Sequence, residues 1–129
     1  MKLLVSPRTI EGAIEAINGG ADIVDCKNPD EGSLGATFPW IIGAVKEEIV
    51  KSKRKDIKLS ATIGDMPQLP GTASLAATGL ATLGVDYVKV GVYGSKTKQE
   101  AVSLLEAIVK ATKRVNPIIK IVAAAYADQ

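Results

Sequence analysis

Two lysines lie inside apolar stretches of the chain, where charged residues need an explanation. Lys27 ends a segment that also contains Asp25, and Lys89 is flanked by Val88 and Val90. A buried lysine is costly unless it is paired or neutral. A neutral amine can attack a carbonyl to give a Schiff base, and a second lysine facing the same cavity favours proton loss from the first. The pattern indicates catalytic lysines with Asp25 as an orienting carboxylate; a buried Lys–Asp ion pair without chemistry is the alternative.

Polar residues also alternate with apolar ones in the segment 59–63. Ser60 and Thr62 share one face of this expected strand, while its apolar residues share the other. If the apolar set faces the helices, Ser60 and Thr62 lie on the same side as the two lysines and Asp25. We therefore predict that Ser60 and Thr62 bind substrate. Asp65 follows this strand and is predicted to bind substrate at the cavity mouth, with a turn-forming role as the alternative.

Other kinds of chemistry have little support in the composition. The sequence contains no histidine, which is the commonest metal ligand and acid–base catalyst, so we expect no metal and no cofactor. The single cysteine, Cys26, excludes an internal disulfide and fits a reducing cytoplasm. Because Cys26 alternates with Asp25 and Lys27, we expect it to face the helices as a small core residue.

The length and charge of the chain limit its partners. The 129 residues are enough for one domain, and 47% of them are hydrophobic. The net charge is +2. A basic cluster near the middle of the chain has no interleaved aromatic residues, so we expect no nucleic-acid partner; it consists of Lys51, Lys53, Arg54, Lys55 and Lys58. No apolar run reaches the roughly 20 residues of a membrane span, so we expect no membrane partner and a cytoplasmic location.

Short apolar runs alternate with helical patterns along the whole chain. Strands are predicted over residues 3–5, 22–27, 59–63, 87–92 and 118–125. Helices are predicted after the cap Thr9, from Pro39, over residues 72–83, and after the capping pair Thr97 and Glu100. Trp40, beside Pro39, is expected to be a packing anchor. This alternation predicts a parallel sheet with right-handed crossovers.

Two architectures fit this order, an open doubly wound sheet and about half of a (β/α)8 barrel. A weak internal repeat supports the prediction of parallel strands, since Gly20–Asp25 resembles Gly84–Lys89. A full barrel needs about 250 residues. The chain stops just after an apolar strand, which we interpret as a hint of truncation. We therefore expect a single partial domain over residues 1–129, with open sheet edges that allow a homo-oligomer.

Several longer motifs resemble one known family. The run K-N-P-D-E-G-S-L-G-A over residues 27–36 and the F-P-W at 38–40 resemble the signature of the (5-formylfuran-3-yl)methyl phosphate synthases of methanofuran biosynthesis. Further segments that match this family lie at residues 60–65, 70–76, 86–94 and 123–128. The similarity spans essentially the whole chain, and the ten-residue run is long enough to be specific.

The resemblance implies a (β/α)8 barrel lyase, of which this chain holds about the first half as five parallel strands and four helices. It implies that two molecules of the phosphosugar glyceraldehyde 3-phosphate are condensed to a furan aldehyde phosphate. Lys27 matches the lysine that forms the Schiff base, and Lys89 matches the proton acceptor and donor. Members of the family are about twice as long as this chain. The alternatives are a non-catalytic phosphosugar-binding fragment and an interaction module that uses the open sheet edges.

Overall fold

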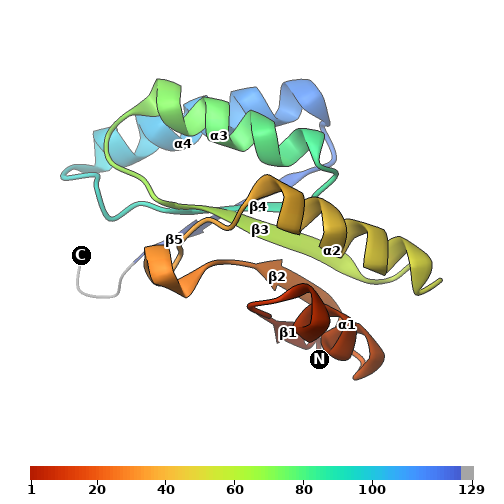
Figure 1. Cartoon of the computed structure of the whole chain (residues 1–129). Helices are drawn as coiled ribbons and strands as arrows, with labels where there is room; N and C mark the ends of the chain where they lie inside the picture. Colours follow the sequence, from red (N-terminus) through yellow and green to blue (C-terminus); the bar gives the residue numbers. More distant parts are fainter. Residues whose placement is uncertain (126–129) are drawn as a thin grey trace.

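The sheet is parallel throughout, and its five strands follow one another in space in the order of the sequence, β1-β2-β3-β4-β5 (Figure 1). The structure is a computed structural model that describes residues 1–125. The strands are β1 Leu4–Val5, β2 Ile23–Cys26, β3 Lys58–Asp65, β4 Tyr87–Gly91 and β5 Lys120–Ala124. The helices are α1 Ile10–Asn18, α2 Pro39–Lys51, α3 Pro70–Thr82 and α4 Lys98–Val115, with a short 3-10 helix η1 at Pro29–Glu31.

The prediction of five parallel strands and four helices is therefore confirmed, with shifts of one or two residues at most element ends. Because the strand order never reverses, the sheet has no topological switch point, which excludes the doubly wound alternative. Right-handed crossovers in a constant direction place the helices on one face of the sheet. The sheet is open, and β1 and β5 are its two edges. The end of the last matching segment, residues 126–128, lies outside the described residues.

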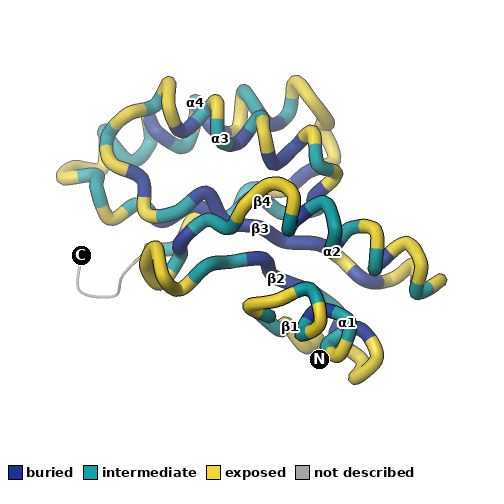
Figure 2. Tube along the Cα trace, in the orientation of Figure 1, coloured by how far each residue is buried: buried dark blue, intermediate teal, exposed yellow. Residues whose placement is uncertain are grey.

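The core lies between the helices and one face of the sheet. In the central strands, the residues that point to this face are buried, and Figure 2 colours much of β3 as buried. They include Val24, Leu59, Ala61, Val88 and Val90, and they pack with helix residues such as Ala13, Ile42, Val45, Leu104 and Ile108. Helices α3 and α4 lie side by side above the sheet in Figure 1. The opposite face of the sheet carries the polar strand residues.

Threonine caps begin two of the helices, as the sequence predicts. The Thr9 hydroxyl accepts a hydrogen bond from the Gly12 N–H at 3.0 Å, and the Thr97 hydroxyl accepts one from the Glu100 N–H at 3.1 Å. The Glu100 carboxylate accepts in turn from the N–H of Lys96, one residue earlier than in the usual capping box.

The internal repeat has a structural counterpart at the start of β2 and β4. The Asp22 carboxylate accepts a hydrogen bond from the Leu3 N–H at 2.7 Å, and the Asp86 carboxylate accepts one from the Leu59 N–H at 2.8 Å. In both copies a glycine with positive φ precedes the aspartate by two residues. In each copy, the aspartate therefore links its strand by a hydrogen bond to the strand that precedes it in the sheet.

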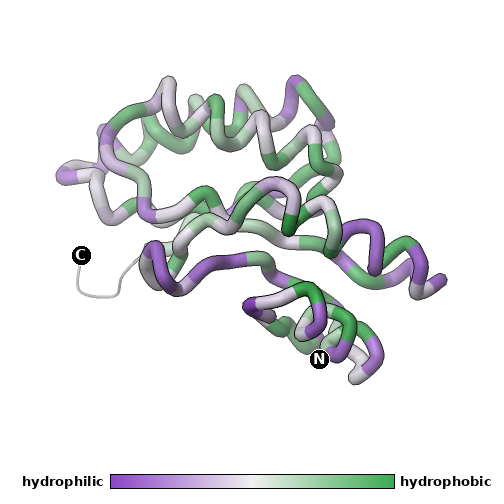
Figure 3. The backbone as a smooth tube through the Cα atoms, in the orientation of Figure 1, coloured by the Kyte–Doolittle hydropathy of each residue, from purple (hydrophilic) through white to green (hydrophobic). Residues whose placement is uncertain are grey.

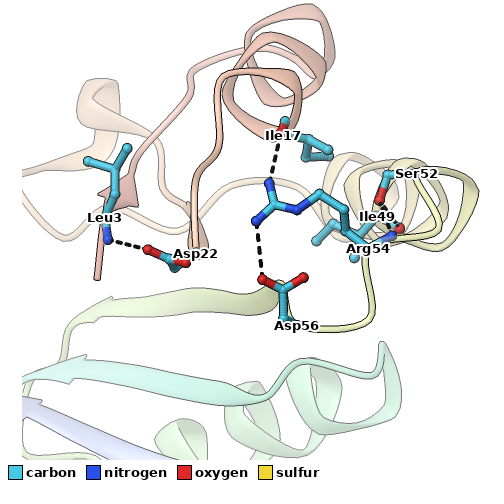
Figure 4. A network of polar contacts seen from close by, with 7 residues as sticks. All are labelled: Leu3, Ile17, Asp22, Ile49, Ser52, Arg54 and Asp56. Carbon is cyan, nitrogen blue, oxygen red and sulfur yellow. Dashed lines mark hydrogen bonds and ion pairs between the residues drawn. The ribbon is translucent and has the colours of Figure 1, made fainter. Parts of the chain in front are cut away.

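Part of the basic cluster after α2 has a structural role. The Arg54 guanidinium donates to the carbonyl of Ile17 at 3.0 Å, at the end of α1, and to the Asp56 carboxylate at 3.3 Å (Figure 4). A cation suits the carbonyl end of a helix. The hydrogen bond from Arg54 holds the pKa of the Asp56 carboxyl below its usual range. Figure 3 shows this end of α2 as largely hydrophilic.

Trp40 is not the packing anchor that the sequence suggests. It is 68% exposed and stacks on Phe38, with ring centroids 4.7 Å apart. The buried stripe of α2 is formed by Ile42, Val45 and Ile49. Successive residues of a helix are about 100° apart around its axis. Trp40 is two residues before Ile42 and therefore lies well away from this stripe on the helix surface.

A glycine inside α3 offers a simple test of the helix packing. A Cβ at Gly79 would meet no heavy atom within 4 Å. Glycine costs about 0.5–1 kcal/mol relative to alanine inside a helix. We expect Gly79→Ala to raise the free energy of unfolding by that amount, measured by urea denaturation. A lower midpoint would mean that α3 packs more tightly at this point than the structure shows.

Candidate active site

The face of the sheet opposite the helices gathers polar side chains from neighbouring strands. The strand register pairs Asp25 of β2 with Ser60 of β3, and Ser60 with Tyr87 of β4. Two residues further along, Thr62 pairs with Lys89. Since residues paired in a parallel sheet point to the same face, these side chains form two successive layers. The sequence prediction that the polar strand residues share one face is consistent with this register.

An ion pair joins the two layers. The Lys89 ammonium donates to Asp25 Oδ2 at 2.9 Å, and the Ser6 hydroxyl donates to the same oxygen at 3.1 Å. The Asp25 side chain is completely buried, and the Lys89 side chain is 17% exposed. Asp25 and Lys89 occupy equivalent positions in the two copies of the internal repeat. The repeat thus places two groups of opposite charge on either side of β3.

Lys27 directly follows β2 and is half-buried. It lies two residues beyond Asp25, so the alternation of the strand directs it to the same face, in the layer of Thr62 and Lys89. Within residues 1–125, no ion pair or hydrogen bond engages the Lys27 ammonium. The two lysines therefore differ in their partners, because the carboxylate of Asp25 contacts Lys89 and not Lys27.

Thr62 and Asp65 link the sheet to the loop that follows Lys27. The Thr62 side chain is buried, donates to the carbonyl of Leu34 at 2.8 Å, and accepts from the Gly64 N–H at 3.1 Å. Asp65 is exposed at the end of β3, and its carboxylate lies directly over Gly91, where a Cβ would overlap it. Thr62 is thus engaged within the protein, while Asp65 stands at the carboxyl end of the strands.

The loop of residues 28–37 is folded back on itself beside Lys27. The Asn28 N–H donates to the carbonyl of Gly35 at 2.7 Å, and the Gly35 N–H donates to the carbonyl of Gly32 at 3.0 Å. The segment from the end of β2 through η1 is coloured mostly hydrophilic in Figure 3. The loop is therefore an ordered polar rim at the carboxyl end of β2 and β3.

The structure adds Ser6 to the residues that the sequence analysis singled out. Ser6 directly follows β1, and its hydroxyl reaches the carboxylate of Asp25. The sequence offers one indication of this role, since Ser6 is the first polar residue after the first apolar run. In a sheet ordered as the sequence, that position lies on the strand next to Asp25.

Cys26 faces the core, as predicted, and is 3% exposed. Burial, followed by the nearby charge of Asp25, raises the pKa of the Cys26 thiol from 9.0 to about 12. The folded protein therefore holds this proton more tightly than the unfolded chain, so the contribution of Cys26 to stability falls as the pH rises from 9.0 toward 12.

We expect the Cys26 thiol to resist alkylation by iodoacetamide at pH 8 in the folded protein and to react fully in denaturant, because the reactive species is the exposed thiolate. Mass spectrometry after timed quenching measures the modified fraction. Rapid labelling of the folded chain would contradict the placement of Cys26 in the core.

Metal-ligand clusters and membrane-spanning helices are both absent from the part of the chain that the structure describes. Residues 1–125 contain no group of three or more His, Cys, Asp or Glu side chains placed to hold a metal ion. Among the same residues, no helix has the length and apolar character needed to cross a membrane.

Comparison with known proteins decides the family. The model of the 4-HFC-P synthase family matches residues 3–129. The chain belongs to this family. The synthases of Methanococcus aeolicus and Archaeoglobus fulgidus, each named (5-formylfuran-3-yl)methyl phosphate synthase, are both 56% identical to it over 128 residues. The synthase of the same name from Methanocaldococcus jannaschii is 55% identical over 128 residues.

These alignments cover 99% of this chain but 53% of each relative. The chain therefore spans about half the length of the curated 4-HFC-P synthases that it matches. The resemblance inferred from the motifs is confirmed at the level of the family.

Proposed function

We propose that this chain forms the N-terminal half of a (β/α)8 barrel lyase that makes (5-formylfuran-3-yl)methyl phosphate from two molecules of glyceraldehyde 3-phosphate in the cytoplasm. Membership of the 4-HFC-P synthase family supports the reaction. The unreversed order of the strands and the placement of the helices on one face support the barrel. The open edges at β1 and β5 are where further strands, from the rest of a longer chain or from a second copy, would pair.

One observation carries the assignment of roles within the site. Asp25 contacts Lys89 at 2.9 Å, and no described carboxylate contacts Lys27. Lys89, which the Asp25 carboxylate orients, is therefore suited to transfer protons. Lys27 has no such partner among the described residues and is suited to be the nucleophile.

The chemistry follows from these roles. The neutral amine of Lys27 attacks the aldehyde carbon of glyceraldehyde 3-phosphate, and loss of water gives the Schiff base. The Lys89 ammonium donates its proton to the hydroxyl that leaves as this water, so the Schiff base forms as an iminium. The iminium withdraws electrons from the adjacent carbon, whose proton the now neutral Lys89 amine accepts. The resulting carbon nucleophile adds to the aldehyde of the second substrate, and loss of water and one phosphate leads to the furan. Asp25 orients Lys89 during both proton transfers.

Substrate contacts are proposed at the carboxyl end of the strands, where active sites of parallel barrels form. Asp65 stands at this end and is exposed. Thr62 shapes the rim through the carbonyl of Leu34 rather than presenting a free hydroxyl. Ser60 lies one layer deeper, at 2% exposure.

The test uses the completed protein, by which we mean a version of the relatives' length with this sequence as its N-terminal half. We expect it to convert glyceraldehyde 3-phosphate to a product with the ultraviolet absorption of a furan aldehyde, with release of one phosphate per furan. Phosphosugar binding without conversion would favour the non-catalytic alternative.

A further inference from the structure

The pairing of β3 with β4 is irregular beside the candidate active site. Thr62 pairs with Lys89. The next pair joins Asp65 to Gly91, so β3 has one residue more than β4 between the two pairs. Gly64, within this bulge, has a φ of 102°, which residues with a side chain rarely adopt. Bulges are uncommon between parallel strands, and they gather next to active sites, where they redirect a side chain.

The extra residue decides which face of the sheet Asp65 occupies. Side chains alternate along a strand, so without the bulge Asp65, three positions after Thr62, would point to the helices and the core. With the bulge it pairs with Gly91, which lies two positions after Lys89 in a regularly paired strand and so has the same facing. The Asp65 carboxylate therefore lies on the face of the two lysines, one layer closer to the carboxyl ends of the strands.

The missing side chain of Gly91 leaves the space that this carboxylate fills. A Cβ at Gly91 would overlap Asp65 Oδ1 and lie 2.9 Å from both Asp65 Cγ and Leu34 Cδ1. Gly91 does not have a positive φ, so its backbone conformation is open to alanine. The need for glycine comes instead from the two neighbouring side chains. Leu34 belongs to the loop beside Lys27, and its carbonyl accepts the hydrogen bond from Thr62.

We infer that Asp65 is a ligand for a hydroxyl group of the substrate, and that Gly91 and the bulge of β3 position it for this role. An ionised carboxylate only accepts hydrogen bonds, so it suits a hydroxyl and repels a phosphate. Successive layers on one face lie about 6.6 Å apart along the strands, so a substrate joined to Lys27 extends from its layer toward Asp65. The role toward the substrate rests on the proposed function, whereas the positioning by Gly91 does not.

The first experiment measures the positioning by folding alone, in the full 129-residue chain. We expect Gly91→Ala to reduce the folding equilibrium constant about 5- to 100-fold, as for an overpacked site. In an Asp65→Ala background the same substitution should change this constant less than about three-fold, because the carboxylate that the new methyl meets is gone and the end of Leu34 can shift. Asp65 is exposed, so Asp65→Ala itself is expected to fold.

Gly79→Ala is the matched control, because a Cβ at that position meets no heavy atom within 4 Å. Its effect on the folding equilibrium constant should be the same with and without Asp65→Ala. Equal effects of Gly91→Ala in the two backgrounds would overturn the positioning of Asp65 by Gly91.

The second experiment measures kinetics in the completed protein. We expect Asp65→Ala to raise KM for glyceraldehyde 3-phosphate about 10- to 100-fold with less than a three-fold change in kcat, as for loss of a hydrogen bond to a charged group that binds substrate and transition state alike. Gly91→Ala should raise KM to a similar degree, and adding it to Asp65→Ala should raise KM no further. Glu106→Ala, which removes an exposed carboxylate of α4, is the control and should leave KM unchanged.

An unchanged KM in Asp65→Ala, or additive effects of the two substitutions, would contradict the assignment. Inorganic phosphate should inhibit Asp65→Ala at least as strongly as the natural sequence, because a repelling charge is removed. Weaker inhibition would overturn the preference of Asp65 for a hydroxyl group. Absence of turnover in the natural sequence would remove the proposed function and the substrate role of Asp65, while leaving the folding result for Gly91 intact.

Discussion

Replacement of Lys27 by arginine is expected to lower turnover of glyceraldehyde 3-phosphate in the completed protein by at least about 1,000-fold, as for loss of a covalent nucleophile. A guanidinium keeps the positive charge but stays protonated and forms no imine. Binding of the phosphorylated substrate should therefore survive, with a dissociation constant within about five-fold of the natural protein, measured by calorimetry.

The matched control is Lys110→Arg, which makes the same replacement at an exposed position of α4. It should leave both binding and turnover unchanged. If Lys27→Arg retained turnover, Lys27 would serve only to neutralise phosphate, and the Schiff-base scheme would be wrong.

Gly35→Ala is expected to lower the free energy of unfolding by about 2–4 kcal/mol, a large effect for one methyl group. A Cβ at Gly35 would overlap the carbonyl oxygen of Asn28 and lie 2.8 Å from the carbonyl carbon of Glu31. Both neighbours are backbone, so the loop has to open rather than shift a flexible side chain. The hydrogen bond from Asn28 N–H to the Gly35 carbonyl would be lost with it.

Urea denaturation measures the loss of stability, and amide hydrogen exchange at Asn28 and Gly35 locates it. Gly79→Ala, where the added methyl meets open space, is the control for the chemical change itself. Because the loop begins directly after Lys27, we also expect the opened loop to reduce turnover in the completed protein. Natural stability together with protected amides would show that the loop is less tightly folded than the structure indicates.

Local patterns predicted most of the fold. Alternating apolar runs gave the order of strands and helices, and the hydroxyls of Thr9 and Thr97 marked two helix starts that the structure confirms. These signals succeed because burial and capping depend on residues close together in the chain. These local patterns could not predict the order of the strands in the sheet, because a singly wound and a doubly wound sheet have the same order of elements along the chain.

The sequence predicts a set of candidate site residues but not the contacts among them. The pleat placed Asp25 and Lys89 on one face, yet whether the carboxylate turns to Lys27 or to Lys89 depends on the register across three strands. The loop's hydrogen bond from Thr62 to Leu34 and the exposure of Trp40 likewise depend on packing between distant segments. Such long-range choices are not encoded in any local spacing.

The most direct test of the central claim is to locate the trapped intermediate. The completed protein is incubated with glyceraldehyde 3-phosphate and reduced with borohydride, and the modified lysine is identified by peptide mass spectrometry. We predict a single major adduct on Lys27, with Lys89 unmodified because its side chain is engaged by the Asp25 carboxylate. An adduct on Lys89 in place of Lys27 would contradict the division of roles between the two lysines.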